Sequence, residues 1–152
     1  MKVIYFMLIA AFMLSSCSSP DDNELPIPAT GIIVENALVS EPPITEDMHN
    51  KEFVIQTDSL NIFNLEVSFD DGVTYEPIDF SKYTLLGKYV PGSGCEVIYS
   101  RNATRDDEAK KVSYEIKADQ YGVCDCSHPS MNWVLIPKIP EDYNVVFSVE
   151  LI

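Results

Sequence analysis

The clearest pattern along the chain is a strict alternation of apolar and polar side chains between residues 63 and 69. The apolar positions are Phe63, Leu65, Val67 and Phe69, and the polar residues Asn64, Glu66 and Ser68 lie between them. A repeat of two residues predicts a strand with one buried and one solvated face. Asp70-Asp71-Gly72 follows and is typical of a hairpin turn, because glycine adopts a positive φ at no steric cost. Val73 and Tyr75 resume the alternation, so we expect a returning strand.

The same period of two recurs toward the C-terminus. Its apolar positions are Val112, Tyr114 and Ile116 in one segment and Val145, Phe147, Val149 and Leu151 in the other. Shorter strand candidates are residues 32–39, 53–57, 84–90, 95–101, 121–126 and 133–136. No window carries the 3.6-residue apolar stripe of a longer helix, although residues 106–111 suit a single helical turn. About nine short strands separated by Gly, Pro, Asn and Asp clusters predict an all-β fold.

Two antiparallel sheets that pack face to face can bury the apolar side of every such strand. We therefore predict an antiparallel β-sandwich, immunoglobulin-like in architecture, over residues 31–152. The resemblance to immunoglobulin-like domains extends to architecture alone, because the Cys-Trp-Cys spacing of antibody domains is missing. A small β-barrel is the alternative, and the order of the strands stays open.

The N-terminus has the layout of a secretory signal. Lys2 precedes an apolar run from Val3 to Leu14, which is shorter than the roughly 20 apolar residues of a membrane-spanning helix. Leu14-Ser15-Ser16-Cys17 resembles the lipobox of bacterial lipoproteins. This resemblance implies cleavage before Cys17 and a lipid on its thiol. An ordinary signal peptide with an accidental cysteine is the alternative.

The segment after Cys17 is acidic and rich in small residues. Ser18-Ser19-Pro20-Asp21-Asp22-Asn23-Glu24 resembles the export signals that follow the lipidated cysteine in surface lipoproteins of Bacteroidetes. This resemblance implies a domain anchored in the outer membrane and exposed on the cell surface. The alternative is a tether that carries no export signal, with the domain facing the periplasm. Pro26 and Pro28 extend the spacer. The predicted organisation is a signal peptide over 1–16, a tether over 17–30 and one domain over 31–152.

The acidity of the chain limits its partners. Cleavage before Cys17 would remove Lys2 and leave 24 acidic residues and 9 basic ones, which give a formal charge of −15. Such a surface repels phosphate backbones and anionic headgroups, so we predict no nucleic-acid partner and contact with the membrane only through the lipid on Cys17. The acidic pairs lie among turn-forming residues and lack the alternating spacing of a Ca²⁺-binding loop. No cofactor is predicted.

Three cysteines remain after Cys17. An oxidising envelope favours disulfides, so we expect Cys95 to pair with either Cys124 or Cys126. A zinc site is the alternative, because Cys95, Cys124, Cys126 and His128 would together supply three thiolates and one imidazole. The single residue between Cys124 and Cys126 departs from the spacing of usual zinc modules, which have two to four residues between their cysteines.

No motif for nucleophilic catalysis is present in the sequence. His49 and His128 are its two histidines, and the closest approach to a Gly-x-Ser-x-Gly elbow, residues 91–94, is typical of a turn between strands. Trp133, at the end of a loop, is a candidate for an exposed stacking surface, and a buried core position is the alternative. We therefore predict a non-catalytic binding or structural module with an unidentified protein or glycan partner. A small zinc-dependent envelope enzyme or metal-binding protein is the alternative.

Overall fold

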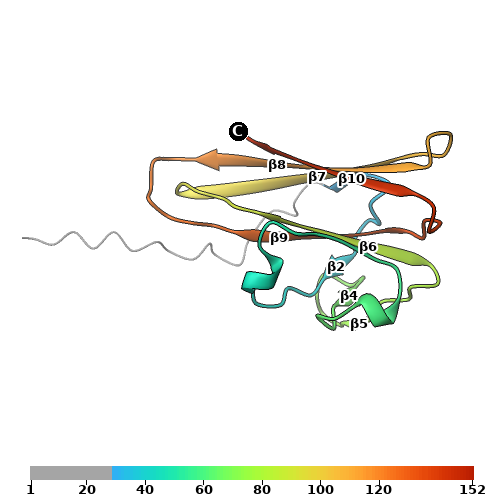
Figure 1. Cartoon of the computed structure of the whole chain (residues 1–152). Helices are drawn as coiled ribbons and strands as arrows, with labels where there is room; N and C mark the ends of the chain where they lie inside the picture. Colours follow the sequence, from blue (N-terminus) through green and yellow to red (C-terminus); the bar gives the residue numbers. More distant parts are fainter. Residues whose placement is uncertain (1–28) are drawn as a thin grey trace, which may run out of the picture.

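The computed structural model describes residues 29–152, which form ten strands and two short 3-10 helices. The predicted signal peptide, Cys17 and the tether up to residue 28 lie outside the described residues. In the described part the fold is mostly β and contains no α-helix, as the sequence predicts, and the strands make three open sheets. None of these sheets closes into a barrel, so the small-barrel alternative is wrong. Figure 1 shows the arrangement of the strands.

The four-stranded sheet has the order β1-β7-β8-β10, with β1 at Ala29–Gly31, β7 at Glu96–Asp106, β8 at Lys111–Tyr121 and β10 at Asn144–Leu151. The central sheet has the order β3-β6-β9, with β3 at Glu52–Ile55, β6 at Tyr83–Val90 and β9 at Ser130–Pro137. The small sheet has the order β2-β4-β5, with β2 at Leu38–Val39, β4 at Glu66–Ser68 and β5 at Glu76–Pro77. The 3-10 helices η1 (Glu46–Met48) and η2 (Asp58–Leu60) flank β3.

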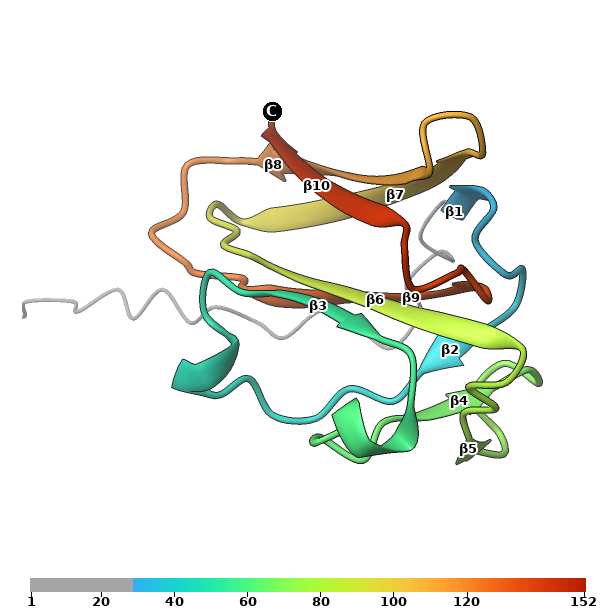
Figure 2. The ribbon, with the colours of Figure 1, turned by 45° about the vertical axis from the view of Figure 1, so that its right-hand side comes forward.

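The central sheet is buried on both faces. On one face Leu86 and Val134 belong to a cluster with Tyr114 of the four-stranded sheet, and on the other Leu85 and Trp133 belong to a cluster with residues of the small sheet. Figure 2 shows the central strands between the other two sheets. The expected arrangement of two sheets with half-buried strands is therefore wrong for β6 and β9. A strand covered on both faces has a nearly continuous apolar sequence, as β9 has from residue 131 to 136.

Two pairings in the four-stranded sheet are parallel, which corrects the prediction of a purely antiparallel arrangement. β10 runs parallel to β8, and β1 runs parallel to β7. The chain leaves β8, passes through β9 in the central sheet and returns as β10. A crossover of this kind brings the chain back in the same direction, whereas a short hairpin reverses it. The alternation of side chains along a strand is the same in both cases, so the sequence pattern does not separate them.

The alternating segments contain strands, but several predicted boundaries are wrong. The strand predicted over residues 63–69 is limited to Glu66–Ser68, and at its end Ser68 is buried while Phe69 is exposed, the reverse of the prediction. Val112, Tyr114 and Ile116 are buried on β8 as predicted. The helical turn predicted over residues 106–111 is wrong: residues 107–110 form the turn of the β7–β8 hairpin, where Lys110 has a positive φ of 48°. The predicted strand over 121–126 ends at Tyr121, and only Leu38–Val39 of the predicted 32–39 segment is a strand.

The hairpin predicted at Asp70-Asp71-Gly72 is confirmed. β4 and β5 pair in antiparallel register, and the turn has positive φ at Asp71 (55°) and Gly72 (81°). The Asp70 carboxylate accepts hydrogen bonds from Ser68 Oγ at 2.6 Å and from the backbone N–H of Thr74 at 2.8 Å. These two hydrogen bonds lower the pKa of Asp70. The returning strand predicted at Val73 and Tyr75 is wrong, because both residues lie in the loop and the strand is limited to Glu76–Pro77.

The folded part begins before the predicted domain boundary. β1 starts at Ala29, and Thr30 lies opposite Asn102 of β7. The last two residues assigned to the tether are therefore part of the four-stranded sheet. Across residues 29–152 no helix has both the length and the apolar character needed to cross a membrane.

Candidate functional site

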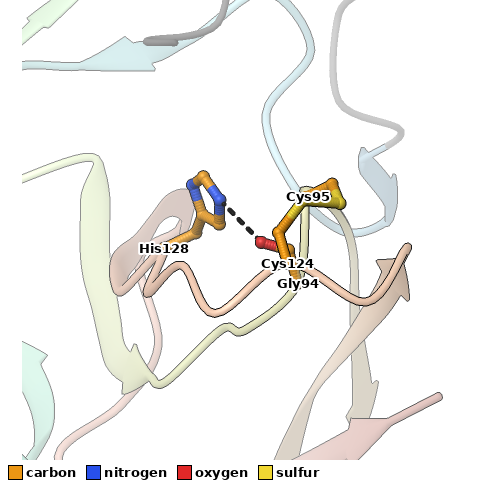
Figure 3. Close-up of a disulfide and its surroundings, with 4 residues drawn as sticks. All are labelled: Gly94, Cys95, Cys124 and His128. Atoms are coloured by element: carbon orange, nitrogen blue, oxygen red, sulfur yellow. Dashed lines mark hydrogen bonds between the residues drawn. A yellow bond between two sulfur atoms is a disulfide. The ribbon is translucent and has the colours of Figure 1, made fainter. Parts of the chain in front are cut away.

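A disulfide joins the two ends of the β7–β8 hairpin. Cys95, immediately before β7, and Cys124, three residues after β8, have an S–S distance of 1.95 Å and a Cα–Cα distance of 4.8 Å. Figure 3 shows this bond and the neighbouring His128. Of the two pairings that the sequence left open, the structure has Cys95 with Cys124. Gly122 turns the chain here with a φ of 79°, and a side chain at this position would overlap Cys95 Sγ.

The disulfide uses two of the four ligands that the zinc alternative requires. Zinc binds thiolates, and the sulfurs of Cys95 and Cys124 are bonded to each other. His128 Nε2 lies 3.2 Å from the carbonyl oxygen of Gly94 (Figure 3). Within the described part of the chain no group of three or more His, Cys, Asp or Glu side chains is arranged to hold a metal ion.

Hydrogen bonds hold the two loops beside the disulfide together. We call residues 91–95 and 122–128 the disulfide loops. The backbone N–H of His128 donates to Gly92 O at 2.9 Å, and the N–H of Gly94 donates to Cys126 O at 3.1 Å. Residues 91–94 therefore form the predicted turn between β6 and β7, braced by the second loop.

Tyr99 fixes the disulfide loops to the core. Its hydroxyl donates a hydrogen bond of 2.6 Å to the backbone oxygen of His128, while its ring is buried in the first core cluster. Burial raises the pKa of Tyr99 to about 12. The phenol therefore remains a neutral donor well above neutral pH.

Trp133 is buried rather than exposed. Its side chain is 5 % exposed and packs against Phe53 and Phe63, with ring centroids at 5.4 and 6.1 Å. The structure therefore places it in the core, the alternative that the sequence allowed, and it offers no exposed stacking surface. Its buried Nε1 has no hydrogen-bond partner within residues 29–152.

A polar network crosses the core between the four-stranded and central sheets. Asn132 is fully buried, and its Oδ1 accepts a hydrogen bond of 2.9 Å from Arg101 Nε. Its backbone oxygen accepts a 3.0 Å bond from the Tyr114 hydroxyl. Burial raises the pKa of Tyr114 well above its usual range, so this phenol also stays protonated. The network satisfies groups that would otherwise be costly to bury.

An open groove lies on the outer face of the four-stranded sheet. It has a volume of about 310 Å³ and is lined by Thr30, Ser100, Arg101, Asn102, Glu115 and Lys117. Thr30 Oγ1 donates to Asn102 Oδ1 at 3.0 Å, and Asn102 Nδ2 donates to Glu115 Oε2 at 3.4 Å. The groove thus presents hydroxyl, amide, carboxylate and ammonium groups on one surface.

Sequence reasoning did not identify this groove. Ser100, Asn102, Glu115 and Lys117 occupy the outward, polar positions of β7 and β8, which any solvated sheet face would also have. The missing signal is the pairing of β1 with β7, which brings Thr30 beside Asn102. Comparison of the chain with protein families, with curated proteins and with solved structures finds no significant match. No relative therefore supplies a role for these residues.

Proposed function

We propose that this chain is a lipid-anchored protein of a bacterial cell envelope and acts as a non-catalytic binding or structural module. In this proposal a lipid on Cys17 holds it at the outer membrane, and the domain faces the cell exterior. The observation that carries the proposal is the Cys95–Cys124 disulfide in a chain whose first 17 residues have the layout of a lipoprotein signal.

The disulfide supports export because structural disulfides persist in oxidising compartments and are rare in the reducing cytosol. Cys95 and Cys124 are both exposed residues, so cytosolic reductants would reach a bond between them. The oxidised state thus agrees with the compartment that the signal predicts. A lipid anchor on Cys17 would strengthen membrane binding by about 0.8 kcal/mol for each CH₂ group that it buries in the membrane.

The groove on the four-stranded sheet supports a binding role. Asn102, Glu115 and Lys117 offer hydrogen-bond donors and acceptors side by side on a surface that the core does not need. Such groups suit a glycan or an extended polypeptide, the two partner classes that the sequence favours. The formal charge of −14 for the whole chain disfavours a nucleic-acid partner.

We also propose that the four-stranded and central sheets form an immunoglobulin-like sandwich, to which the small sheet adds a further layer. Support comes from the shared core cluster that joins Leu86 and Val134 to Tyr114 and Ile116. The parallel pairings of β1 and β10 are departures from the antiparallel sheets of immunoglobulin domains.

Fractionation of cells that express the full chain tests the proposal. The unmodified protein should stay with the outer membrane after high-salt and carbonate washes, because acyl chains and not charges hold it. Cys17→Ala should accumulate as uncleaved precursor or be released, whereas the neighbouring Ser18→Ala should behave like the unmodified protein. A Cys17→Ala variant that is processed and still resists both washes would overturn the lipid anchor.

Protease treatment of intact cells tests the orientation separately. A domain on the cell surface should be digested by added protease without permeabilisation. Protection that is lost only when the outer membrane is opened would place the domain in the periplasm. That result would refute surface exposure and leave the anchor itself intact.

A further inference from the structure

β10 forms one edge of the four-stranded sheet, and its outer side is unpaired within residues 29–152. The strand runs for eight residues, Asn144–Leu151, whereas the opposite edge strand β1 has three. In Figure 2, β10 lies beside β8 and ends close to the C-terminus of the chain. A long edge strand exposes a row of backbone groups that can pair with another strand.

The hydrogen bonds at both ends of β10 show which backbone groups face outward. The N–H of Asn144 donates to Lys110 O, the N–H of Ile152 donates to Ala118 O, and Ile152 O accepts from the N–H of Gln120. Even-numbered residues therefore bond toward β8. Because successive residues of a strand direct these groups to opposite sides, the odd-numbered ones direct theirs to the free edge. These are Val145, Phe147, Val149 and Leu151, and no residue in the described part of the chain bonds to their backbone groups.

The features that usually protect an edge strand are missing from β10. It contains no proline and pairs with β8 residue for residue without a bulge. Its one charged side chain is Glu150, whose carboxylate forms a 3.0 Å ion pair with Lys117 of the neighbouring strand. Although the whole chain has a large negative charge, β10 has little net charge, so two copies of this strand would repel each other only weakly.

We propose that β10 pairs with β10 of a second copy of this chain, antiparallel and about a two-fold axis at Ser148. This register places Val145 opposite Leu151 and Phe147 opposite Val149. It pairs the outward N–H and C=O groups of all four residues, since opposed residues of this type exchange both hydrogen bonds. The two four-stranded sheets then continue as one sheet across the dimer.

The side chains are complementary to themselves in the same register. On the inner face the facing pairs are all apolar, and they cover the exposed parts of Val149 and Leu151, which are 36 % and 51 % exposed in the single chain. On the outer face Glu150 lies opposite Val146, so no two like charges are opposed. Apolar cross-strand pairs of this kind stabilise the pairing of two strands. A shift of the axis to Phe147 would leave Leu151 without an apolar strand partner, which favours the axis at Ser148.

Cross-linking in the full, membrane-bound protein tests the pairing. Two Ser148 residues on the axis form a pair without mutual hydrogen bonds, with Cα atoms about 4.5 Å apart, a distance that a disulfide spans. Ser148→Cys should therefore convert most of the protein to a covalent dimer under mild oxidation, visible on a non-reducing gel. Ser113 on β8 points to the same outer face of the sheet as Ser148 but lies one strand away from the edge. The control variant Ser113→Cys should therefore remain monomeric.

A second substitution separates the proposed interface from accidental oxidation. Val149→Lys in the Ser148→Cys background should reduce the covalent dimer at least tenfold, because the ammonium group would lie against Phe147 of the other copy. The circular dichroism of this variant should match that of the parent, since Val149 is already partly exposed. The proposal is overturned if Ser148→Cys stays monomeric, if Ser113→Cys dimerises equally, or if Ser148→Cys links instead to a protein of different mass.

Discussion

The indole ring of Trp133 occupies the space that Gly87 leaves by having no side chain. The two residues lie opposite each other on the antiparallel strands β6 and β9, and a Cβ placed on Gly87 would overlap the six-membered part of the ring. Phe53 lies opposite Gly87 on the other side, in β3, and its ring also packs on Trp133. A glycine in the middle of a central strand is thus required by the residue that faces it.

Gly87→Ala should lower the free energy of unfolding by about 3 kcal/mol, near the upper end of the range for overpacking a core. Phe53 and Phe63 pack against the indole ring, so the ring cannot shift away from the new methyl group without disturbing them. Urea unfolding followed by circular dichroism measures the loss. A variant as stable as the parent would contradict the described contact.

Trp133→Leu provides the matched control for that clash. Alone it should destabilise the protein, because it removes buried aromatic volume. Combined with Gly87→Ala it should cost less than the two separate losses together, since the smaller side chain leaves room for the new methyl group. Strict additivity would show that Gly87→Ala acts through the backbone and not through Trp133.

The disulfide should contribute substantially to stability. Cys95 and Cys124 are 29 residues apart in the sequence, and the chain-entropy relation gives about 3.5 kcal/mol for closing a loop of this size. Replacement of both by serine should lower the free energy of unfolding by that order while the β circular dichroism persists, because the β7–β8 ladder does not depend on the bond. A loss below about 1 kcal/mol would contradict a structural role.

The choice of Cys124 over Cys126 can be checked by peptide mapping. Asp125 lies between the two cysteines, so cleavage before aspartate separates them under non-reducing conditions. The fragment 79–105, which contains Cys95, should be linked to fragment 119–124. A link between fragments 79–105 and 125–141 would mean that Cys126 is the partner of Cys95.

Tyr99 should make the protein sensitive to alkaline pH. Its pKa is raised from 10.0 to about 12 by burial, so the folded state favours the protonated phenol. The corresponding stability is fully present below pH 10 and is lost as the pH rises from about 10 through 12. Urea unfolding of Tyr99→Phe should therefore show a shallower fall in stability over this interval than the parent.

The same variant should already be weaker at neutral pH. Loss of the hydroxyl that donates to His128 O removes one partly buried hydrogen bond, a cost of about 1 kcal/mol. Tyr121→Phe on the exposed end of β8 serves as the control at pH 7 and should change stability little. Identical alkaline profiles for the parent and Tyr99→Phe would show that Tyr99 does not titrate as described.

Local structure was predictable wherever one face of a strand meets solvent. Val112, Tyr114 and Ile116 alternate with polar residues because β8 has a solvated outer face, and the Asp70–Gly72 turn carries its own conformational signal. The central strands are different: in β9 both faces are covered, so Trp133 and Val134 are both buried and no alternation remains to be read. The sequence therefore indicated the strands without indicating a third sheet.

The candidate site was predictable only where chemistry restricts the choice. Few cysteines compete for Cys95, so the sequence alone narrows its partner to Cys124 or Cys126. The decision between them depends on the path of residues 122–128, which leave the strand after Tyr121. The groove depends on β1 lying parallel to β7, a contact between segments some 70 residues apart that no local pattern encodes.

Lipidation of Cys17 is the step on which both the proposed export and the proposed anchoring depend. Mass spectrometry of the N-terminal tryptic peptide, taken from the protein isolated from cell membranes, tests it most directly. We expect a peptide that begins at Cys17, ends at Lys51 and carries a diacylglycerol on the cysteine sulfur. A peptide that begins at another residue, or one with an unmodified Cys17, would contradict the lipid anchor.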